Sequence, residues 1–436
     1  MTTTPAVALR YRGRIRDLDA SAYRRLRDRS TSSDPAIQER VAGIIADVRA
    51  RGDAALRELA LRYDGVSLES LEVAHPDWTR ALNDLDPQMR RAMERSARNI
   101  ACVHGASRPA PFECEPEPGV IVGRRPDPLA CVGVYAPGGT AAYPSSVLMG
   151  AVPARAAGVG QVVLSSPPRA DGATPLVLAA AAIAHVDRVF AVGGAGAIAA
   201  MAYGTESIPR VDRIVGPGNA YVAEAKLQVT GAVAIDSPAG PSELLVLADD
   251  TCDPRAVAME LAAQAEHDPR ACVVAVAVGD DTALCLTAAI AAVVGTQPRA
   301  AIIERALASS GGVLSAPSLE DAIAFANDYA PEHLLLALAD PDAALARVRN
   351  AGTVFVGAST SVSFGDYMTG ANHVLPTGGL ARSYSGLSPL DFVRWTTYQR
   401  VSPNAAAGLA RDVAVFARGE GFPGHAGAAL RAGGLA

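Results

Sequence analysis

From about residue 130 onward, short apolar runs alternate with longer alanine-rich stretches, and this alternation limits the folds open to the chain. The apolar runs predict strands at Cys131–Tyr135, Val162–Ser165, Val189–Val192 and Ile214–Val215. The stretches between them have helical character and cover Ser146–Ala157, Thr174–His185, Ala195–Tyr203 and Asn219–Val229. Strands that alternate with helices form βαβ units, in which the strands lie parallel in one sheet.

The same alternation begins again after Ala239-Gly240-Pro241. Further strands are predicted at Leu244–Leu247, Cys272–Val278, Gly312–Leu314, Leu334–Leu336 and Thr353–Val356. A chain of 436 residues is longer than one ordinary domain. Two α/β units in tandem are the simplest account, although no strong residue-level repeat relates them.

The residues before residue 130 are predicted to be mainly helical. Asp34–Pro35 is a helix cap followed by proline, and Val41, Ile44, Ile45 and Val48 then recur at helical spacing. Further helices are expected between Gly52 and Gly65 and from Asp86–Pro87 onward.

The tail beyond about Val374 lacks the strand–helix alternation. It is predicted to contain glycine-rich turns and helical segments such as Leu390–Tyr398, and it is too short to bury a core of its own.

The predicted fold class is therefore α/β, with two tandem Rossmann-like parallel-sheet domains, a helical N-terminal region and a C-terminal tail. We expect a division into an N-terminal helical arm over 1–33, one α/β domain from 34–130 plus 242–376, a second α/β domain over 131–241, and the tail over 377–436.

Charge and hydropathy exclude several classes of partner. The net charge is −6, and the arginine-rich start is interrupted by Asp17, Asp19 and Asp28, so it predicts a solvated helical face and no nucleic-acid arm. The most apolar runs are shorter than the ~20 residues of a membrane span, and the polar N-terminus has no signal-peptide pattern. Six scattered cysteines without a C-x-x-C pair argue against a disulfide framework and a cysteine-type zinc site. We expect a cytoplasmic protein without membrane or nucleic-acid partners.

Three glycine-rich turns follow predicted strands in the second domain. They are Ala136-Pro137-Gly138-Gly139, the Rossmann-like stretch from Gly194 to Ala199, and Gly216-Pro217-Gly218-Asn219. Such turns can place a phosphate-bearing ligand at the carboxyl ends of parallel strands. Loops between strands and helices also need glycine for structural reasons, so both interpretations stay open on this pattern alone.

Two clusters carry candidate chemistry. His267 is predicted to end a helix, with Gln264 one turn earlier on the same face, and Asp366 could add an oxygen ligand; Q-x-x-H alone is a weak zinc pattern. Glu332 and His333 pair a carboxylate with an imidazole, as a base and proton shuttle require. Adjacent strand residues point to opposite faces, but the preceding proline favours a loop here.

The chain resembles the histidinol dehydrogenase family over nearly its whole length. The matching segments are RGDAALRELALRYDG, VYAPGGTAAYPSSVLM, VGGAGAIAAMAYGTESIP, VGPGNAYVAEAK, DSPAGPSELLVLAD, QAEHDP, APEHL, GDYMTGANHVLPT and, near the C-terminus, EGFPGH.

The resemblance implies a homodimer with shared active sites. Zinc is expected to bind Gln264, His267 and Asp366 together with His425, which the neighbouring subunit donates. L-histidinol is expected to contact the zinc ligands and also Ser242, His333 and Glu420.

The resemblance also implies oxidation of histidinol through the aldehyde to histidine with two NAD, the last steps of histidine biosynthesis. His333 is the expected base, and Glu332 is expected to activate the water that hydrates the aldehyde. Tyr135 and Asn219 match cofactor-contacting positions. Gly196 stands where the family typically has glutamine, which removes one expected cofactor hydrogen bond and creates the Rossmann-like pattern by accident.

Three other functions compete with this one. The first is a related dehydrogenase for another small alcohol such as a sulfonated diol; Ser242, Glu420 and His425 favour histidinol. The second is a catalytically silent binding protein, which should have lost Glu332 or His333. The third is a thiol-dependent aldehyde dehydrogenase, which would require Cys131.

Overall fold

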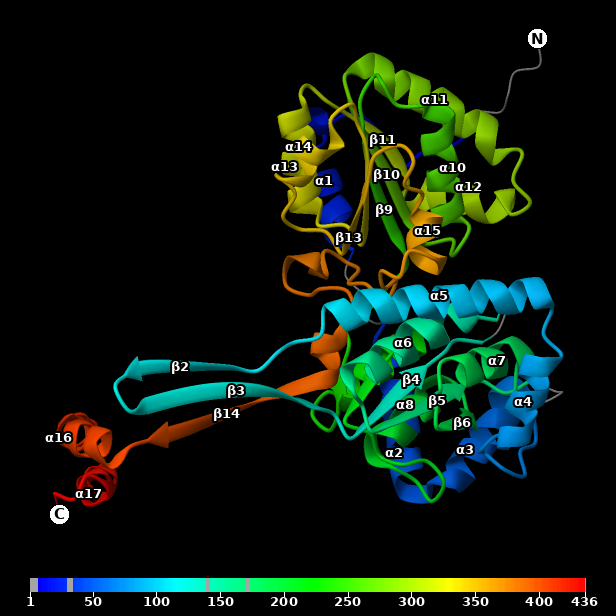
Figure 1. Ribbon diagram of the computed structural model, residues 1–436. Coiled ribbons are helices and arrows are strands. Elements are labelled where there is room, and N and C mark those ends of the chain that lie inside the picture. The colour runs from blue at the N-terminus through cyan, green and yellow to red at the C-terminus, as the bar shows by residue number, and fades with distance from the viewer. Residues whose placement is uncertain (1–6, 30–33, 139–141, 170–172, 436) are drawn as a thin grey trace, which may run out of the picture.

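The computed structural model describes residues 7–29, 34–138, 142–169 and 173–435. Figure 1 shows two α/β units, one above the other, and a long arm that projects from the lower unit. The predicted α/β class with parallel sheets is confirmed.

The lower unit is built on a five-stranded parallel sheet in the order β6-β5-β4-β7-β8. The strands are β4 (Cys131–Tyr135), β5 (Gln161–Ser166), β6 (Arg188–Ala191), β7 (Arg213–Val215) and β8 (Ala234–Ile235). Its central strands are buried on both faces, which explains why they are continuous apolar runs in the sequence.

Helices cover both faces of this sheet. One face packs against α4 (His75–Asn83), α5 (Pro87–Ala106), α6 (Pro144–Ala157) and α7 (Pro175–Ile183). The other face packs against α2 (Pro35–Arg51), α3 (Asp53–Leu59), α8 (Gly194–Tyr203) and α9 (Ala220–Val229), and a π-helical turn (Ala60–Asp64) follows α3. The assignment of 34–130 to the other unit was therefore wrong for these helices, because their apolar faces are buried against the five-stranded sheet.

The upper unit has a six-stranded parallel sheet in the order β1-β11-β10-β9-β12-β13. The strands are β1 (Tyr11–Arg14), β9 (Glu243–Ala248), β10 (Cys272–Val278), β11 (Gly312–Ala316), β12 (His333–Ala337) and β13 (Thr353–Val356). Without β1, its order along the chain is the same as that of the lower sheet.

Two helical layers enclose the six-stranded sheet. One layer holds α10 (Pro254–Ala265), α11 (Asp280–Val294) and α12 (Ala300–Ser310). The other holds α1 (Ala20–Arg27), α13 (Leu319–Tyr329) and α14 (Pro341–Leu345), and α15 (Val362–Tyr367) follows β13. The N-terminal arm was expected to be helical throughout, but Tyr11 to Arg14 pair with Gly312 to Ser315 and extend the sheet edge.

The arm is an antiparallel sheet of β2 (Phe112–Glu117), β3 (Val120–Pro128) and β14 (Val393–Val401), which ends in α16 (Pro403–Gly419) and α17 (Pro423–Ala432). The prediction of a helix over Leu390–Tyr398 was wrong. Short 3-10 turns at Leu380–Arg382 and Pro389–Phe392 precede β14, which pairs with β3 along its whole length, so tertiary pairing decides its conformation.

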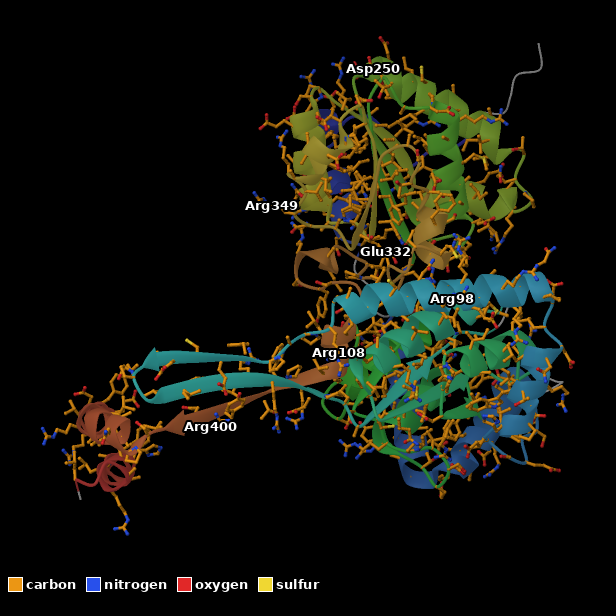
Figure 2. All side chains as sticks on the ribbon, in the orientation of Figure 1. Arg98, Arg108, Asp250, Glu332, Arg349 and Arg400 are labelled. Carbon is orange, nitrogen blue, oxygen red and sulfur yellow. The ribbon has the colours of Figure 1, made fainter. Side chains whose placement is uncertain are left out.

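The connection between the units joins the carboxyl end of the lower sheet to the amino end of the upper sheet. Segment 236–242 runs directly from the carboxyl end of β8 to the amino end of β9. Glu332 lies at the side of the upper unit that faces α5, which carries Arg98 (Figure 2). Among the described residues, no helix is both long and apolar enough to cross a membrane.

Candidate active site

Glu332 and His333 lie at the amino end of β12, beside the first residue of β9. Glu332 occupies a bend and His333 begins the strand, so both side chains reach Glu243. The backbone N–H of Glu243 donates to Glu332 Oε2 at 2.7 Å, and the carbonyl oxygen of Glu243 lies 2.9 Å from His333 Nδ1. The expected loop therefore includes Glu332 but not His333, which is the first residue of β12; the bend at Glu332 still allows both residues to contact Glu243.

These contacts define which nitrogen of His333 carries the proton in the neutral ring. A carbonyl oxygen can only accept, so Nδ1 donates and Nε2 holds the lone pair. Nε2 lies 3.6 Å from Asp366 Oδ1, is buried and has no hydrogen-bond partner. The ring of Phe355 stacks on the imidazole at 5.9 Å between centroids. A basic nitrogen thus faces the side of the site where Asp366 lies.

The charged groups at this site shift one another's pKa. Burial opposes the charged form of His333, but the carboxylates of Glu332 and Asp366 outweigh it and raise the pKa of the imidazole well above its usual value. Burial raises the pKa of Glu332, although His333 opposes this shift. Both shifts favour the protonated forms, and each group lies close enough to influence the protonation of the other.

Helices α10 and α15, which carry the candidate ligands Gln264 and Asp366, are joined by a hydrogen bond. Glu260 Oε2 accepts from the backbone N–H of Val362 at 3.1 Å, and Gln264 and Asp366 lie one turn further along the two helices. Burial acts to raise the pKa of Asp366, but nearby histidines, including His267, outweigh it and lower the pKa.

His373 supports Asp366 from the following loop. Its Nδ1 lies 3.0 Å from the backbone carbonyl oxygen of Asp366, and burial lowers the pKa of the ring. Sequence analysis placed His373 in a matching segment without giving it a role. Its position is defined by tertiary contacts that local spacing does not reveal.

The donor types of the three candidate ligands are ones that a zinc ion accepts. Gln264, His267 and Asp366 offer an amide oxygen, an imidazole nitrogen and a carboxylate oxygen, and Gln264 is buried. Across the described ranges, no three His, Cys, Asp or Glu side chains are grouped closely enough to hold a metal. Three donors leave one position of a tetrahedral zinc site open.

Glu420 and His425 are not near these residues in the same chain. Glu420 caps the end of α16 and His425 lies in α17, at the far end of the arm (Figure 1). Both are exposed, and the ring of His425 packs only loosely on Phe422, at 5.5 Å between centroids. The structure thus leaves the two C-terminal site residues available to a second molecule.

The glycine-rich turns lie at the carboxyl ends of the lower sheet. The Tyr135 hydroxyl accepts from the backbone N–H of Gly194 at 3.0 Å, at the start of α8. Gly216 has a φ of +113° and lies against the Tyr135 carbonyl, so a side chain there would collide. Asn219 caps α9 by accepting from the N–H groups of Tyr221 and Val222. Gly139 of the first turn lies outside the described residues.

A buried ion pair, which the sequence pattern did not reveal, supports the third of these turns, at Gly216. The ammonium of Lys226 pairs with Asp236 and donates to the Gly216 carbonyl at 3.1 Å, and Asp236 accepts from the Gly216 N–H at 2.7 Å. An interior pair of this kind holds a loop firmly because each charge needs its partner.

Two other candidates take positions that argue against a chemical role. A Cβ on Gly196 would lie 2.8 Å from Leu59 Cδ1, so this position faces the packing between α8 and α3. Cys131 is half-buried at the amino end of β4, and burial, with Asp212 and Asp187, raises the pKa of its thiol to about 11. Neither position therefore presents a reactive side chain to Glu332 or His333. Ser242 immediately precedes Glu243 and is half-buried.

Comparisons with known proteins agree with this arrangement. A family model described as histidinol dehydrogenase matches residues 27–431. The histidinol dehydrogenase of Methanosarcina barkeri (strain Fusaro / DSM 804) is 42% identical over 415 residues, which cover 95% of each chain. That of Xanthomonas euvesicatoria pv. vesicatoria is 47% identical over 400 residues, 91% of this chain and 93% of the relative. The crystal structure of histidinol dehydrogenase from Elizabethkingia anophelis superimposes with a TM-score of 0.91 at 33% identity and covers 97% of both chains. The chain therefore belongs to the histidinol dehydrogenase family of oxidoreductases.

Proposed function

We propose that this chain oxidises L-histidinol through the aldehyde to L-histidine with two NAD and one zinc ion per site, as the last steps of histidine biosynthesis. The observation that supports the proposal is that Glu332, His333 and Asp366 lie together at the amino end of β12 in the upper sheet. His267 is close to Asp366.

In this proposal His333 removes the alcohol proton at Nε2, the nitrogen left without a hydrogen bond. Glu332 holds a carboxylate beside His333 Nδ1, 3.4 Å away, and takes a proton from the water that adds to the aldehyde. Tyr135 and Asn219, at the carboxyl ends of the lower sheet, would help to hold NAD, which would supply the hydride acceptor for each oxidation.

Gln264, His267 and Asp366 would hold zinc together with His425 of the partner subunit. The ion would supply a positive charge that orients the amine and ring nitrogens of the substrate. Ser242 and the partner subunit's Glu420 would complete the pocket for histidinol. The homodimer belongs to the proposal because the exposed end of the arm carries both C-terminal residues.

The cysteines support a cytoplasmic location as part of the same proposal. All six are free thiols in the structure, which fits a reducing compartment.

The test is an assay of NADH formation with L-histidinol, with and without a chelator, run beside the His267→Asn variant. We expect chelation to abolish turnover, added zinc to restore it in the parent enzyme, and His267→Asn to stay inactive. Full activity in chelator would overturn the zinc assignment, and absence of NADH with zinc-loaded parent enzyme would overturn the substrate.

A further inference from the structure

A buried ion pair stands directly behind the acid–base residues. Arg29 Nε donates to Glu243 Oε1 at 2.8 Å, and its Nη2 donates to Glu243 Oε2 at 3.1 Å. The two side chains are only 5% and 2% exposed. A bidentate pair of this kind combines charge with a fixed geometry.

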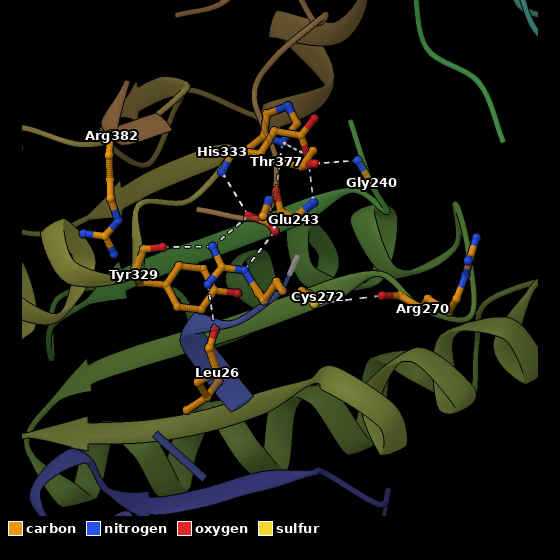
Figure 3. Close-up of polar contacts among 12 residues, drawn as sticks. Leu26, Gly240, Glu243, Arg270, Cys272, Tyr329, His333, Thr377 and Arg382 are labelled. Carbon is orange, nitrogen blue, oxygen red and sulfur yellow. Dashed lines mark hydrogen bonds and ion pairs between the residues drawn. The ribbon is translucent and has the colours of Figure 1, made fainter. Parts of the chain in front are cut away.

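Glu243 touches the acid–base residues with both its backbone and its side chain. Its N–H binds the Glu332 carboxylate, its carbonyl accepts from His333 Nδ1, and its Oε2 accepts from the backbone N–H of Glu332 at 3.3 Å. Figure 3 shows Glu243 between His333 and Tyr329. The position of this one residue therefore sets the direction of both functional side chains.

Arg29 connects Glu243 to the loop that carries Glu332. Its Nη2 donates to the Tyr329 carbonyl at 2.9 Å, and its guanidinium lies over the Tyr329 ring at 3.5 Å from the centroid. Its Nη1 donates to the Leu26 carbonyl at the end of α1 at 2.6 Å. An N-terminal side chain thus holds the last turn of α13, three residues before Glu332.

The segment after Asp366 is tied to the same carboxylate. The backbone N–H of Gly378 donates to Glu243 Oε1 at 2.8 Å, and the neighbouring Thr377 hydroxyl accepts from the Gly240 N–H at 2.6 Å. Segments near residues 29, 243, 330 and 378 therefore meet at one carboxyl group. A contact that served stability alone would not need to converge on the backbone of the acid–base pair.

We propose that Arg29 and Glu243 are positioning residues that hold Glu332 and His333 in their working geometry. This inference rests on the proposed function of those two residues. Neither Arg29 nor Glu243 is assigned a contact with substrate; they act through the hydrogen bonds to the pair.

The test compares Arg29→Met and Arg29→Lys with the parent enzyme in steady-state kinetics. For Arg29→Met we expect kcat to fall about 10- to 100-fold, the usual effect of losing an outer support of a site, and KM for histidinol and NAD to change less than about threefold. Arg29→Lys keeps the positive charge but cannot make the two parallel hydrogen bonds to Glu243. It should therefore fold and have a kcat between those of Arg29→Met and the parent enzyme. The matched control is Arg14→Met, which removes a more exposed N-terminal pair with Asp280 and should leave kcat unchanged.

A double variant separates positioning from simple stabilisation. Because Arg29 is proposed to act through Glu332 and His333 together, Arg29→Met should slow an enzyme that already carries His333→Asn less than it slows the parent enzyme. Multiplied losses, or a fall in kcat that follows the folded fraction measured by circular dichroism, would overturn the inference. If Arg29→Met does not fold, the same comparison is made with Arg29→Lys, alone and combined with His333→Asn. An unchanged kcat in folded Arg29→Lys would also overturn the inference. Full activity of His333→Asn would instead contradict the proposed function itself.

Discussion

At the scale of single residues, the site depends on where two neighbouring side chains can point. Glu332 lies in a bend and His333 opens a strand, and Gly352 lies directly against the first of them. A Cβ on Gly352 would lie 2.5 Å from the Glu332 carbonyl oxygen. The two chain segments therefore approach more closely than any side chain would permit.

The first prediction concerns the division of labour between the two residues. We expect His333→Asn to slow the oxidation of histidinol by about 10²- to 10⁴-fold, the usual contribution of a general base. Glu332→Gln should slow the conversion of the aldehyde to histidine more than it slows the first oxidation. NADH formation from histidinol and from histidinal, measured separately, gives both values. Equal losses in the two steps for Glu332→Gln would contradict its role with water.

The second prediction concerns Cys131. A thiol whose pKa is raised to about 11 stays protonated at pH 8, with only about one thiolate in a thousand, and the thiolate is the nucleophile. Cys131→Ser should therefore keep nearly all activity. Alkylation at pH 8 should also leave turnover intact, and its rate at this residue should rise as the pH approaches 11. Loss of activity in a folded Cys131→Ser enzyme would favour a thiol mechanism instead.

Part of the site could be predicted from the sequence, because it depends on residue types and on short spacings along the chain. Glu332 and His333 were predicted as an acid–base pair, and Gln264 and His267 as ligands one helical turn apart. Arg29 was assigned to a solvated face, and Glu243 received no role at the start of an apolar strand. Their pairing spans more than two hundred positions along the chain, and no local pattern records such a contact.

At the scale of elements, prediction succeeded where local sequence determines conformation. The strands β4, β10 and β13 were predicted with their observed bounds, because each is a short run of mostly apolar and β-branched residues. The strands β1, β2, β3, β8 and β14 were missed. They lie at an edge or in the exposed arm, where residues such as Arg12 and Arg124 face solvent and pairing with distant segments sets the conformation.

The third prediction concerns the loop after β7, which Lys226 and Asp236 hold. We expect Lys226→Met to lower the free energy of unfolding by about 3 kcal/mol, because it leaves a buried carboxylate without its partner. KM for NAD should rise because the Gly216 turn loses its support. Urea denaturation and steady-state kinetics test both effects.

The control for this prediction is Arg210→Met in the same unit. Arg210 donates to the Ala232 carbonyl at the surface, so its loss should change stability by less than about 0.5 kcal/mol. Unchanged stability in Lys226→Met would show that the buried pair does not hold the loop.

At the scale of the whole molecule, the end of the arm exposes apolar side chains that its own chain does not cover. Helices α16 and α17 bury a small cluster of alanines, Ala414, Ala417 and Ala426, against each other, with Leu430 packed beside it. Phe416 is 71% exposed and Val415 is 69% exposed. Apolar surface of this kind, beside Glu420 and His425, supports the proposal that the arm end docks on a partner subunit.

The fourth prediction tests the sharing of sites directly. Subunits with His333→Asn and subunits with His425→Asn should each form inactive homodimers. A heterodimer purified with two different tags would contain one doubly altered site and one intact site, so it should recover about half of the parent activity. A heterodimer as inactive as the two homodimers would show that each site is built within one chain.

The pairing of β1 with β11 has a consequence for the nascent protein. Tyr11 leaves the ribosome long before Gly312, its partner in the sheet, whereas the strands between Cys131 and Ile235 are all synthesised in one stretch. The lower unit can therefore complete its sheet first, while β1 waits with unpaired backbone groups that chaperones or other strands can capture. Slowing translation should lengthen this exposed interval and increase the share of newly made chains that aggregate.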